Sequence, residues 1–518
     1  VTIGGMLQLG PTSFSFGLRA QNQVQFADSV TWIRGRHQIK VGVDQRIVRE
    51  NWINKSNPSG QFSFAASLTG NPQSPAGTGV GMATYLLGDV TSGSLTVRSH
   101  MSFHSWSHAS YIQDDYKITP RLTLNLGLRY DLRSGPVERW NKHSNFDPFN
   151  INPETKMLGL LTYAGVNAPR NFVDRNNTDF GPRFGFAYAL TGDGKTVIRG
   201  AYGIVHMLTE SNDMQADSSN SLGWEATTTF ASTRGSNYPA FQFSDGPSML
   251  VMPKGAAGGP SAFRGQNVRW QSYEHASPYL QQANLTLQRE IVGQWVLSAS
   301  YAGSRGVHIP GSNYNLNQLD PKYYLQYGLG LQNMVANPFY GQIASGGLSG
   351  ATVAMSQLLL PYPDYGSVMT MANYGDSSTY HSLQLTAEKR YSKGISALIS
   401  YTNGKLIDEG YSSAGSSGEI GDFRIGRLNR RLDRAIDQND ISQRLVASGV
   451  FELPFGKGKA FASHAPKAVD YIIGGWQANT ITTIQTGNPL SVRGANNFAL
   501  NWPNLVKNPT LSGEDRGV

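Results

Sequence analysis

The sequence predicts an all-β protein whose strands form one large antiparallel barrel across a membrane. Three observations lead to this prediction: a long stretch of two-residue alternation, a composition poor in apolar and charged residues, and very short turns that alternate with very long loops. From Leu122 to Leu132, Leu or Tyr occupies every second position, and polar residues or Gly lie between them. A period of two indicates a strand with one apolar and one polar face.

The length of this strand favours a membrane crossing over a soluble fold. A tilted strand needs about 9–11 residues to cross a bilayer, whereas globular strands have about 5–6 residues. The turn before the strand, around Pro120, is so short that it can only join the two arms of a hairpin. Residues 104–133 therefore form the hairpin that we take as the repeating unit.

The composition agrees with a barrel that has a wet interior. Hydrophobic residues make up 39% of the chain and charged residues 15%, and there are 58 Gly. Soluble proteins have about 45–50% apolar and about 25% charged residues. A transmembrane barrel needs apolar residues only on its outer band, so a low apolar content is expected for it.

Several function classes lose support at this stage. The chain has no Cys, which excludes disulfides, thiolate metal sites and Cys nucleophiles. The net charge is +8, but the basic residues are scattered and form no block beside aromatic residues, so nucleic-acid binding is not predicted. The sequence contains no run of 18 apolar residues, so it predicts no transmembrane helix.

The predicted strands pair in chain order across short turns. About 14–16 strands can be traced, within the range known for membrane barrels. The hairpins combine residues 24–33 with 37–51, the two arms of 104–133, 180–190 with 196–207, 279–290 with 295–309, and 380–391 with 395–407. Residues 61–64, 85–97, 443–453 and 475–486 are further predicted strands, the first two of them weak.

Loops of about 30–70 residues separate these hairpins, and structureless loops of that length argue against a compact soluble domain. Short turns on the periplasmic side and long loops outside are typical of an outer-membrane barrel. Aromatic residues near the strand ends suit an interfacial girdle, although Tyr and Trp are common in any strand. The girdle candidates are Tyr111, Tyr116, Tyr130, Trp295, Tyr301, Tyr380, Tyr391, Tyr401 and Trp476.

An ordered set of stretches resembles the TonB-dependent outer-membrane receptors, in particular their Oar-like group. The matching stretches are residues 29–44, 109–131, 179–188, 278–290, 300–309, 337–341, 380–394, 451–461 and 473–481. The resemblance implies a barrel of about 22 strands with a plug domain. It also implies energised uptake, with outer-membrane lipid, an external ligand and an inner-membrane energising complex reached through a TonB box as partners.

We expect residues 1–518 to be a single barrel region and an internal part of a larger receptor. No stretch of the chain resembles the plug, the TonB box, the regulatory-like domain or the final strands of that family. These parts would then belong to the full-length protein.

No stretch predicts an enzyme, a cofactor or a metal. The GKGK stretch at residues 456–459 lacks the Ser/Thr and the following helix of a phosphate-binding loop. His104 and His108 share a strand face but have no third ligand nearby in the sequence. Asp114 and Asp115 are adjacent and point to opposite faces, so they cannot act together as acid and base; one of them is expected to line the lumen.

The ligand candidates lie in long loops and are weak. Exposed aromatic residues can stack on a ligand, and Arg can bind an anion through two parallel hydrogen bonds. The alternatives are aromatic residues that pack between loops and a charged loop that is simply solvated. The candidates are Trp224, Trp270, Tyr273, Phe339, Tyr340, Arg427, Arg430 and Arg431.

Three functions remain open from the sequence. The first is a barrel that takes up an unidentified substrate with energy from the inner membrane. The second is an outer-membrane structural or adhesin-like barrel without transport. The third is a soluble extracellular all-β protein that binds carbohydrate.

Overall fold

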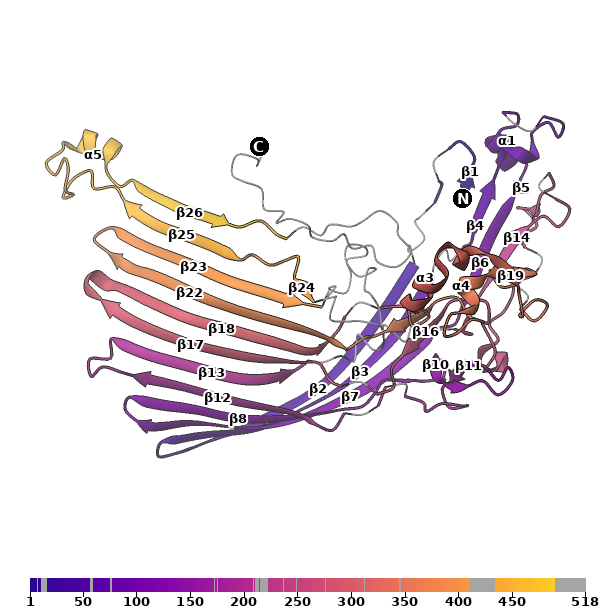
Figure 1. Cartoon of the computed structure of the whole chain (residues 1–518). Helices are drawn as coiled ribbons and strands as arrows, with labels where there is room; N and C mark the ends of the chain where they lie inside the picture. The colour runs from indigo at the N-terminus through magenta and orange to yellow at the C-terminus, as the bar shows by residue number, and fades with distance from the viewer. Residues whose placement is uncertain are drawn as a thin grey trace.

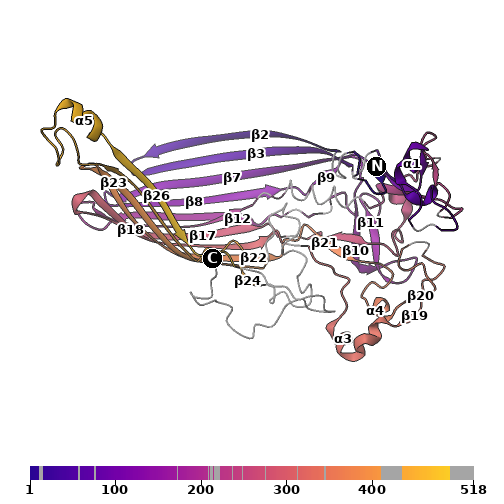
Figure 2. The ribbon, with the colours of Figure 1, turned by 90° about the horizontal axis from the view of Figure 1, so that it is seen from above.

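The computed structural model is built around one curved antiparallel sheet (Figures 1 and 2). The structure describes residues 1–6, 8–10, 16–55, 59–74, 77–171, 173–174, 176–207, 209, 214, 222–235, 237–247, 249–274, 276–311, 313–343, 346–409 and 434–489. Within these residues the main sheet has 14 strands, in agreement with the predicted fold class. It is not closed, and β2 and β26 are its two edges.

The long strands of this sheet follow one another in chain order, and each pairs with the next. They are β2 (Phe16–Arg34), β3 (His37–Lys55), β7 (Met101–Thr119), β8 (Leu122–Arg133), β12 (Asp179–Ala189), β13 (Thr196–His206), β17 (Tyr279–Ile291), β18 (Trp295–Ile309), β22 (Asp376–Ser392), β23 (Ile395–Asp408), β25 (Gln443–Glu452) and β26 (Gln477–Gln485). Two short strands, β9 (Val137–Glu138) and β24 (Ala435–Ile436), pair with β7 and β23. All the strong hairpin predictions are confirmed.

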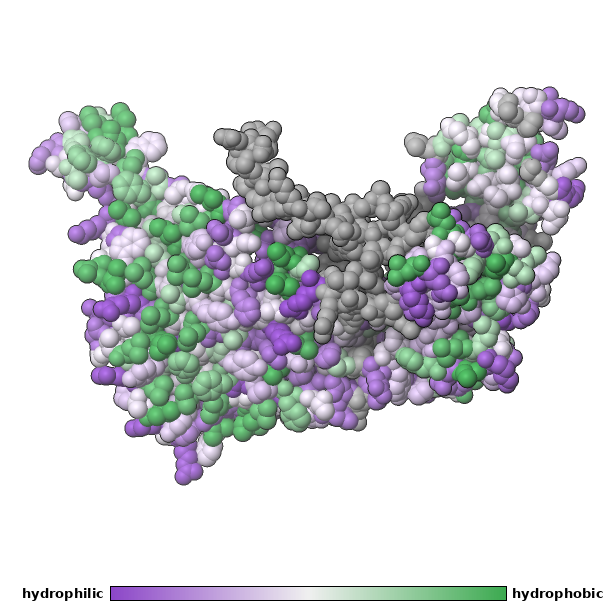
Figure 3. All heavy atoms as spheres, in the orientation of Figure 1, coloured by the Kyte–Doolittle hydropathy of each residue, from purple (hydrophilic) through white to green (hydrophobic). Residues whose placement is uncertain are grey.

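Cross-strand register gathers the apolar side chains on one side of the sheet, which we call the apolar face. Leu126 of β8 lies opposite Phe184 of β12, and Phe184 lies opposite Tyr202 of β13. Leu285 and Tyr301 form the same kind of pair between β17 and β18. Green side chains gather over β12 to β26 in Figure 3. The stripe from Leu122 to Leu132 lies on this face, as its alternation predicts.

The opposite side of the sheet, the polar face, carries mainly Gly, Ser, Thr, Asn, Gln and charged residues. The hydroxyl groups of Thr286 and Ser300 share a hydrogen bond of 3.0 Å across β17 and β18. Asp115 lies on this face and accepts a hydrogen bond of 2.6 Å from Asn125, as expected for one member of the Asp pair. Asp114 lies on the apolar face, where it pairs with His37 at 2.7 Å.

Cross-strand register tests which face the predicted girdle residues occupy. Tyr116, Tyr130 and Tyr301 lie opposite apolar-face residues. Tyr111 and Tyr380 were expected in the girdle, but this prediction is wrong because cross-strand register places both on the polar face. Both residues lie one strand position out of phase with the apolar stripe, so the pleat turns them to the other side.

Five of the hairpin turns are short, and they lie together at the left end of Figure 1. The turn at Lys393 and Gly394 has positive φ at both residues, 53° and 76°, which matches the twist of a two-residue hairpin. The sixth connection, between β25 and β26, contains the helix α5 (Lys467–Ile473) and is an exception to the predicted short turns.

The long connections, predicted as irregular loops, fold together at the other end of the sheet into what we call the loop assembly (Figure 1). It contains β1 (Thr2–Ile3), β4 (Gln61–Phe64), β5 (Asp89–Val90), β6 (Ser92–Arg98), β10 (Ser144–Ile151), β11 (Leu158–Tyr163), β14 (Glu225–Ala231), β15 (Phe241–Gln242), β16 (Val268–Gln271), β19 (Met334–Ala336), β20 (Thr352–Ala354), β21 (Val368–Met371), α1 (Gly81–Leu86), α3 (Pro321–Tyr327) and α4 (Met355–Leu358). The predicted strand at residues 85–97 is partly wrong, because Tyr85 belongs to α1 and the rest forms β5 and β6 outside the main sheet.

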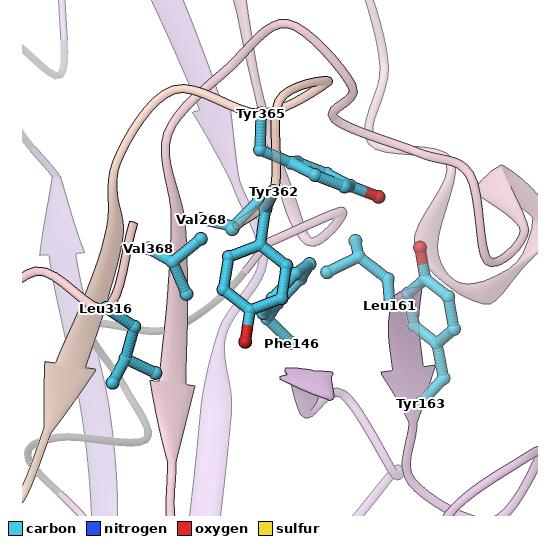
Figure 4. Packing of buried hydrophobic residues seen from close by; sticks show 8 residues of the cluster. All are labelled: Phe146, Leu161, Tyr163, Val268, Leu316, Tyr362, Tyr365 and Val368. Carbon is cyan, nitrogen blue, oxygen red and sulfur yellow. The ribbon is translucent and has the colours of Figure 1, made fainter. Parts of the chain in front are cut away.

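A buried apolar cluster joins these connections (Figure 4). Its members come from four separate stretches and are Phe146, Leu161, Tyr163, Val268, Leu316, Tyr362, Tyr365 and Val368. The ring of Phe146 packs edge-on against Tyr362 and Tyr365, with centroids 5.4 and 5.0 Å away. In the described part of the chain, no helix has the length and apolar character needed to cross a membrane.

Candidate ligand-binding site in the loop assembly

A large cavity lined by the loop assembly has a volume of about 1140 Å³. Its walls come from three connections that are far apart in the sequence. Arg98 of β6 and Glu225 of β14 lie on one side, Arg269 of β16 beside them, and β20 and α4 opposite. Ligand sites in proteins commonly have volumes of about 300–1,000 Å³, so this cavity can hold a small ligand.

Strand pairing explains how the charged residues come together. β6 and β14 are antiparallel, and Glu225 is the direct cross-strand partner of Arg98. The two side chains form an ion pair. β16 pairs in parallel with β21, which places Arg269 opposite Met369 and next to the apolar cluster.

The charge balance of the cavity is positive. Among the described residues that line it, Arg98 and Arg269 are basic and Glu225 is the one acid. Partial burial lowers the pKa of the Arg269 guanidinium; Arg98 adds to this effect and Glu225 opposes it. Glu225 already pairs with Arg98, so Arg269 gives the cavity its net positive charge, and this charge suits a ligand with an acidic group.

Side-chain amides fix the cavity wall. Gln357 donates to the carbonyl oxygens of Pro363 and Tyr365, each at 2.8 Å. Asn267 accepts a hydrogen bond from the backbone N–H of Ser367 at 2.8 Å. The Gln357 bonds fix the wall within one connection, and the Asn267 bond ties that connection to the one that carries Arg269.

An ion pair behind the wall supports the same region. Asp364 is buried and accepts a hydrogen bond of 3.0 Å from Arg264. Burial raises the pKa of the Asp364 carboxyl, while the Arg264 guanidinium acts in the opposite direction. Burial also raises the pKa of the neighbouring Tyr365 phenol. The region behind the cavity is therefore a packed scaffold.

The aromatic residues predicted from the sequence do not line this cavity. Phe339 is only 6% exposed and packs in a small apolar cluster, whereas Tyr340 is 62% exposed. Trp224 is half-buried against a cluster that includes Phe103. Trp270 is half-buried and meets the ring of Phe149 edge-on.

Tyr273 is exposed and also lies away from the cavity. Arg427, Arg430 and Arg431 lie outside the described residues. A ligand role for any of the predicted residues stays a prediction.

The sequence offered no signal for Arg98, Glu225 and Arg269, because only the folded connections bring them together. In the described residues no third metal ligand joins His104 and His108. Within the described ranges, no group of three or more His, Asp or Glu side chains is arranged to hold a metal ion.

The whole chain can be compared with protein-family models. The model described as "Outer membrane beta barrel domain" matches residues 1–517. The chain belongs to this outer-membrane β-barrel family. It is therefore a protein of the bacterial outer membrane, and its apolar face is the lipid-facing side of the sheet. The prediction of a soluble extracellular protein is wrong, because membership of this family places the chain in the membrane.

Solved structures of outer-membrane receptors show distant likeness. The alcaligin receptor FauA from Bordetella pertussis is 11% identical, with 85% of this chain and 44% of that chain covered and a TM-score of 0.33. The transporter YddB from Escherichia coli is 10% identical, with 84% of this chain and 40% of that chain covered and a TM-score of 0.44. The ferripyoverdine receptor of Pseudomonas aeruginosa is also 10% identical, with 84% of this chain and 36% of that chain covered and a TM-score of 0.34.

The chain spans less than half the length of these three receptors. A search of curated proteins found no match.

Proposed function

We propose that this outer-membrane barrel belongs to a TonB-dependent receptor of the Oar-like group, which takes up a ligand bearing an acidic group. The loop assembly captures the ligand outside the cell, and the polar face of the sheet lines its path. The energy comes from the inner membrane through a plug domain and a TonB box, which the sequence resemblance implies for the full-length protein. Residues 1–518 form a single barrel region in this proposal.

The observation that carries the proposal is the cavity between three long connections. A barrel that served only as a membrane anchor would have no need to fold its loops around a cavity of about 1140 Å³ with two basic side chains. The cavity lies in the loop assembly, at the end of the sheet that faces the outside of the cell in this family. The polar face below it is rich in small and hydrogen-bonding side chains.

A second function also has an observation in its favour. In the described part of the chain the loop assembly contains three buried apolar clusters, and a fourth joins it to β3 and β7, so it could present a rigid surface to another cell or protein. In that case the barrel would be a structural or adhesin-like protein without transport. The two functions differ in their need for energy.

The test uses cells that carry the full-length protein and a panel of labelled acidic ligands. Surface binding is measured separately from uptake, with and without a protonophore that collapses the proton-motive force. We expect Arg269→Gln to weaken surface binding about tenfold, since a hydrogen bond to a charged group contributes about 1.5–3 kcal/mol. Collapse of the proton-motive force should stop uptake and leave binding intact. Uptake that persists without the proton-motive force would contradict energised transport.

A further inference from the structure

A second large groove lies outside the loop assembly, on the apolar face of the sheet beside β2, β3 and β7. Its volume is about 980 Å³, and Arg49, His104 and Arg139 are among the residues that line it. The outer-membrane assignment makes this face the lipid side, so the groove opens toward the membrane. The inference below depends on that assignment and does not depend on transport.

Strand register places the groove at the upper border of the apolar band. Val24, Ile47 and Trp106 form one cross-strand row on the apolar face. The next row on the same face, one step toward the loop assembly, is Asn22, Arg49 and His104. The row on the other side of Ile47 is mixed and contains Phe26, Gln45 and His108. The step from Ile47 to Arg49 is where an arginine first appears on this face of β3, as expected near the lipid headgroups.

Arg139 joins this level through β9. The cross-strand partner of His104 in β9 is Val137, and the backbone N–H of Arg139 donates to the carbonyl of Ser102 at 2.8 Å. Arg139 follows β9 directly, in the turn after Glu138, and its side chain lines the groove. Its guanidinium lies 5.3 Å from the ring centre of the exposed Trp140.

The acidic neighbours of these arginines point away from the groove. Glu50, next to Arg49, is completely buried on the other face and pairs with Arg19 at 2.9 Å. Glu138, next to Arg139, is also buried and accepts backbone hydrogen bonds from Ser102, Trp140 and Lys142. Alternation along β3 therefore turns Arg49 outward and Glu50 inward, while Glu138 is buried and Arg139 lines the groove.

No acid balances the basic residues on the outer side. Among the described residues that line the groove there is no carboxylate, and no ion pair involves Arg49, His104 or Arg139 in the described part of the chain. The remaining polar lining includes Asn22, Gln45 and Asn51, whose amides can bind hydroxyl groups.

We propose that this groove binds the phosphorylated sugar headgroup of a membrane glycolipid. Arg49 and Arg139 hold the phosphate, the amides of Asn22 and Asn51 meet the sugar hydroxyls, and Ile47 and Trp106 contact the acyl chains. A soluble anion would gain only the contacts to the arginines. A lipid gains the apolar contacts as well, and it is already present at the required depth.

The test uses the full-length protein purified in the neutral detergent dodecyl maltoside, with diphosphorylated lipid A as the probe. Binding is measured by native mass spectrometry. We expect Arg49→Gln combined with Arg139→Gln to weaken binding about 30-fold, because a basic side chain near an anionic membrane surface contributes about 1 kcal/mol. The matched control is Arg183→Gln combined with Arg199→Gln, which removes two positive charges from the polar face and should leave binding within about twofold of the original.

Two further measurements use the unaltered protein, so they hold even if the double variant fails to fold. Lipid A without its phosphates should bind the unaltered protein weakly. Its affinity should be no higher than that of phosphorylated lipid A for the double variant. Inorganic phosphate at millimolar concentration should not displace the phosphorylated lipid. Equal binding of both lipids, unchanged binding by the double variant, or full displacement by inorganic phosphate would each overturn the proposal; the last outcome would assign the groove to a soluble anion.

Discussion

The main sheet and the loop assembly place the same kinds of residue in opposite environments. Leu285, on the apolar face of β17, is 46% exposed, whereas Phe146 in the loop assembly is 0% exposed. The sheet turns its apolar side chains outward because lipid surrounds it, and the loop assembly turns them inward because water does. An apolar residue therefore has a different energetic role in each region.

The two regions also differ in what holds them together. The main sheet is stabilised by long ladders of backbone hydrogen bonds, and every long strand pairs over most of its length. The loop assembly has short strands and depends on its buried clusters. Substitutions that act on ladders, on lipid contact and on buried packing should separate the two regions experimentally.

The largest effect is expected in the core of the loop assembly. Phe146→Ala removes a ring that packs against Tyr362 and Tyr365, and should cost about 3–5 kcal/mol of local stability. Phe149→Ala on the same strand is the control; that ring is 74% exposed and meets Trp270 edge-on, so the cost should stay below about 1.5 kcal/mol. Hydrogen exchange in residues 144–163 measures both. Equal effects of the two substitutions would mean that the connections have no packed core.

A charge on the apolar face should have the next largest effect. Leu285→Arg, near the middle of β17, should destabilise the folded protein in lipid by about 2–4 kcal/mol. Asn284→Arg, at the adjacent position on the polar face, should cost less than about 1 kcal/mol because its side chain meets water. Urea unfolding of the full-length protein in vesicles measures the difference, and a reversed order would mean that the faces are assigned the wrong way round.

A packing effect on the polar face is expected to be smaller. A Cβ on Gly42 would lie 2.5 Å from the ring of Tyr111, so Gly42→Ala should displace that ring and cost about 1–3 kcal/mol. At Gly127 the nearest atom to an added Cβ is 3.6 Å away, and Gly127→Ala should be close to neutral. The same vesicle unfolding assay compares the two. Similar costs would show that Tyr111 does not lie over Gly42.

The smallest effect at neutral pH concerns Tyr163. Its hydroxyl donates to the carbonyl of Gly259 at 3.2 Å, and Tyr163→Phe should cost about 0.5–1.5 kcal/mol. Burial raises the pKa of this phenol from 10.0 to about 12, so the unfolded chain loses the proton first. The loop assembly should therefore lose stability as the pH rises from 10 to about 12.

Tyr163→Phe lacks the ionisable group, so the difference between the variant and the original protein should narrow over this alkaline range. Ultraviolet titration of the phenol, together with hydrogen exchange of residues 158–163, follows both quantities. A constant difference across the range would contradict the raised pKa.

The sequence predicted the main sheet almost completely, because two-residue alternation is a local signal. The prediction of residues 295–309 agrees with β18, and most other strand ends lie within a few residues. The loop assembly was not predicted, since β14 and β16 are short strands whose partners, β6 and β21, lie far away in the chain. Tyr111 shows a further limit: aromatic character suggested the girdle, but only its phase in β7 decides which face it occupies.

The candidate sites differ in the same way. The cavity depends on Arg98, Glu225 and Arg269, which lie more than a hundred residues apart at the extremes and have no common motif. The glycolipid groove depends on strand phase, so part of its signal was present in the sequence: Arg49 and Ile47 are two residues apart on one strand. What the sequence could not supply was the return of β9 beside β7, which adds Arg139.

The central claim is that one face of the sheet meets lipid and the other meets water, and site-directed spin labelling tests it most directly. The chain has no Cys, so single Cys residues can be introduced along β17 (Tyr279–Ile291) and labelled without background. With the full-length protein in vesicles, oxygen accessibility should peak at positions 283, 285 and 287, and accessibility to a water-soluble nickel complex at 284, 286 and 288. Accessibility without a two-residue period, or with the two sets exchanged, would contradict the account.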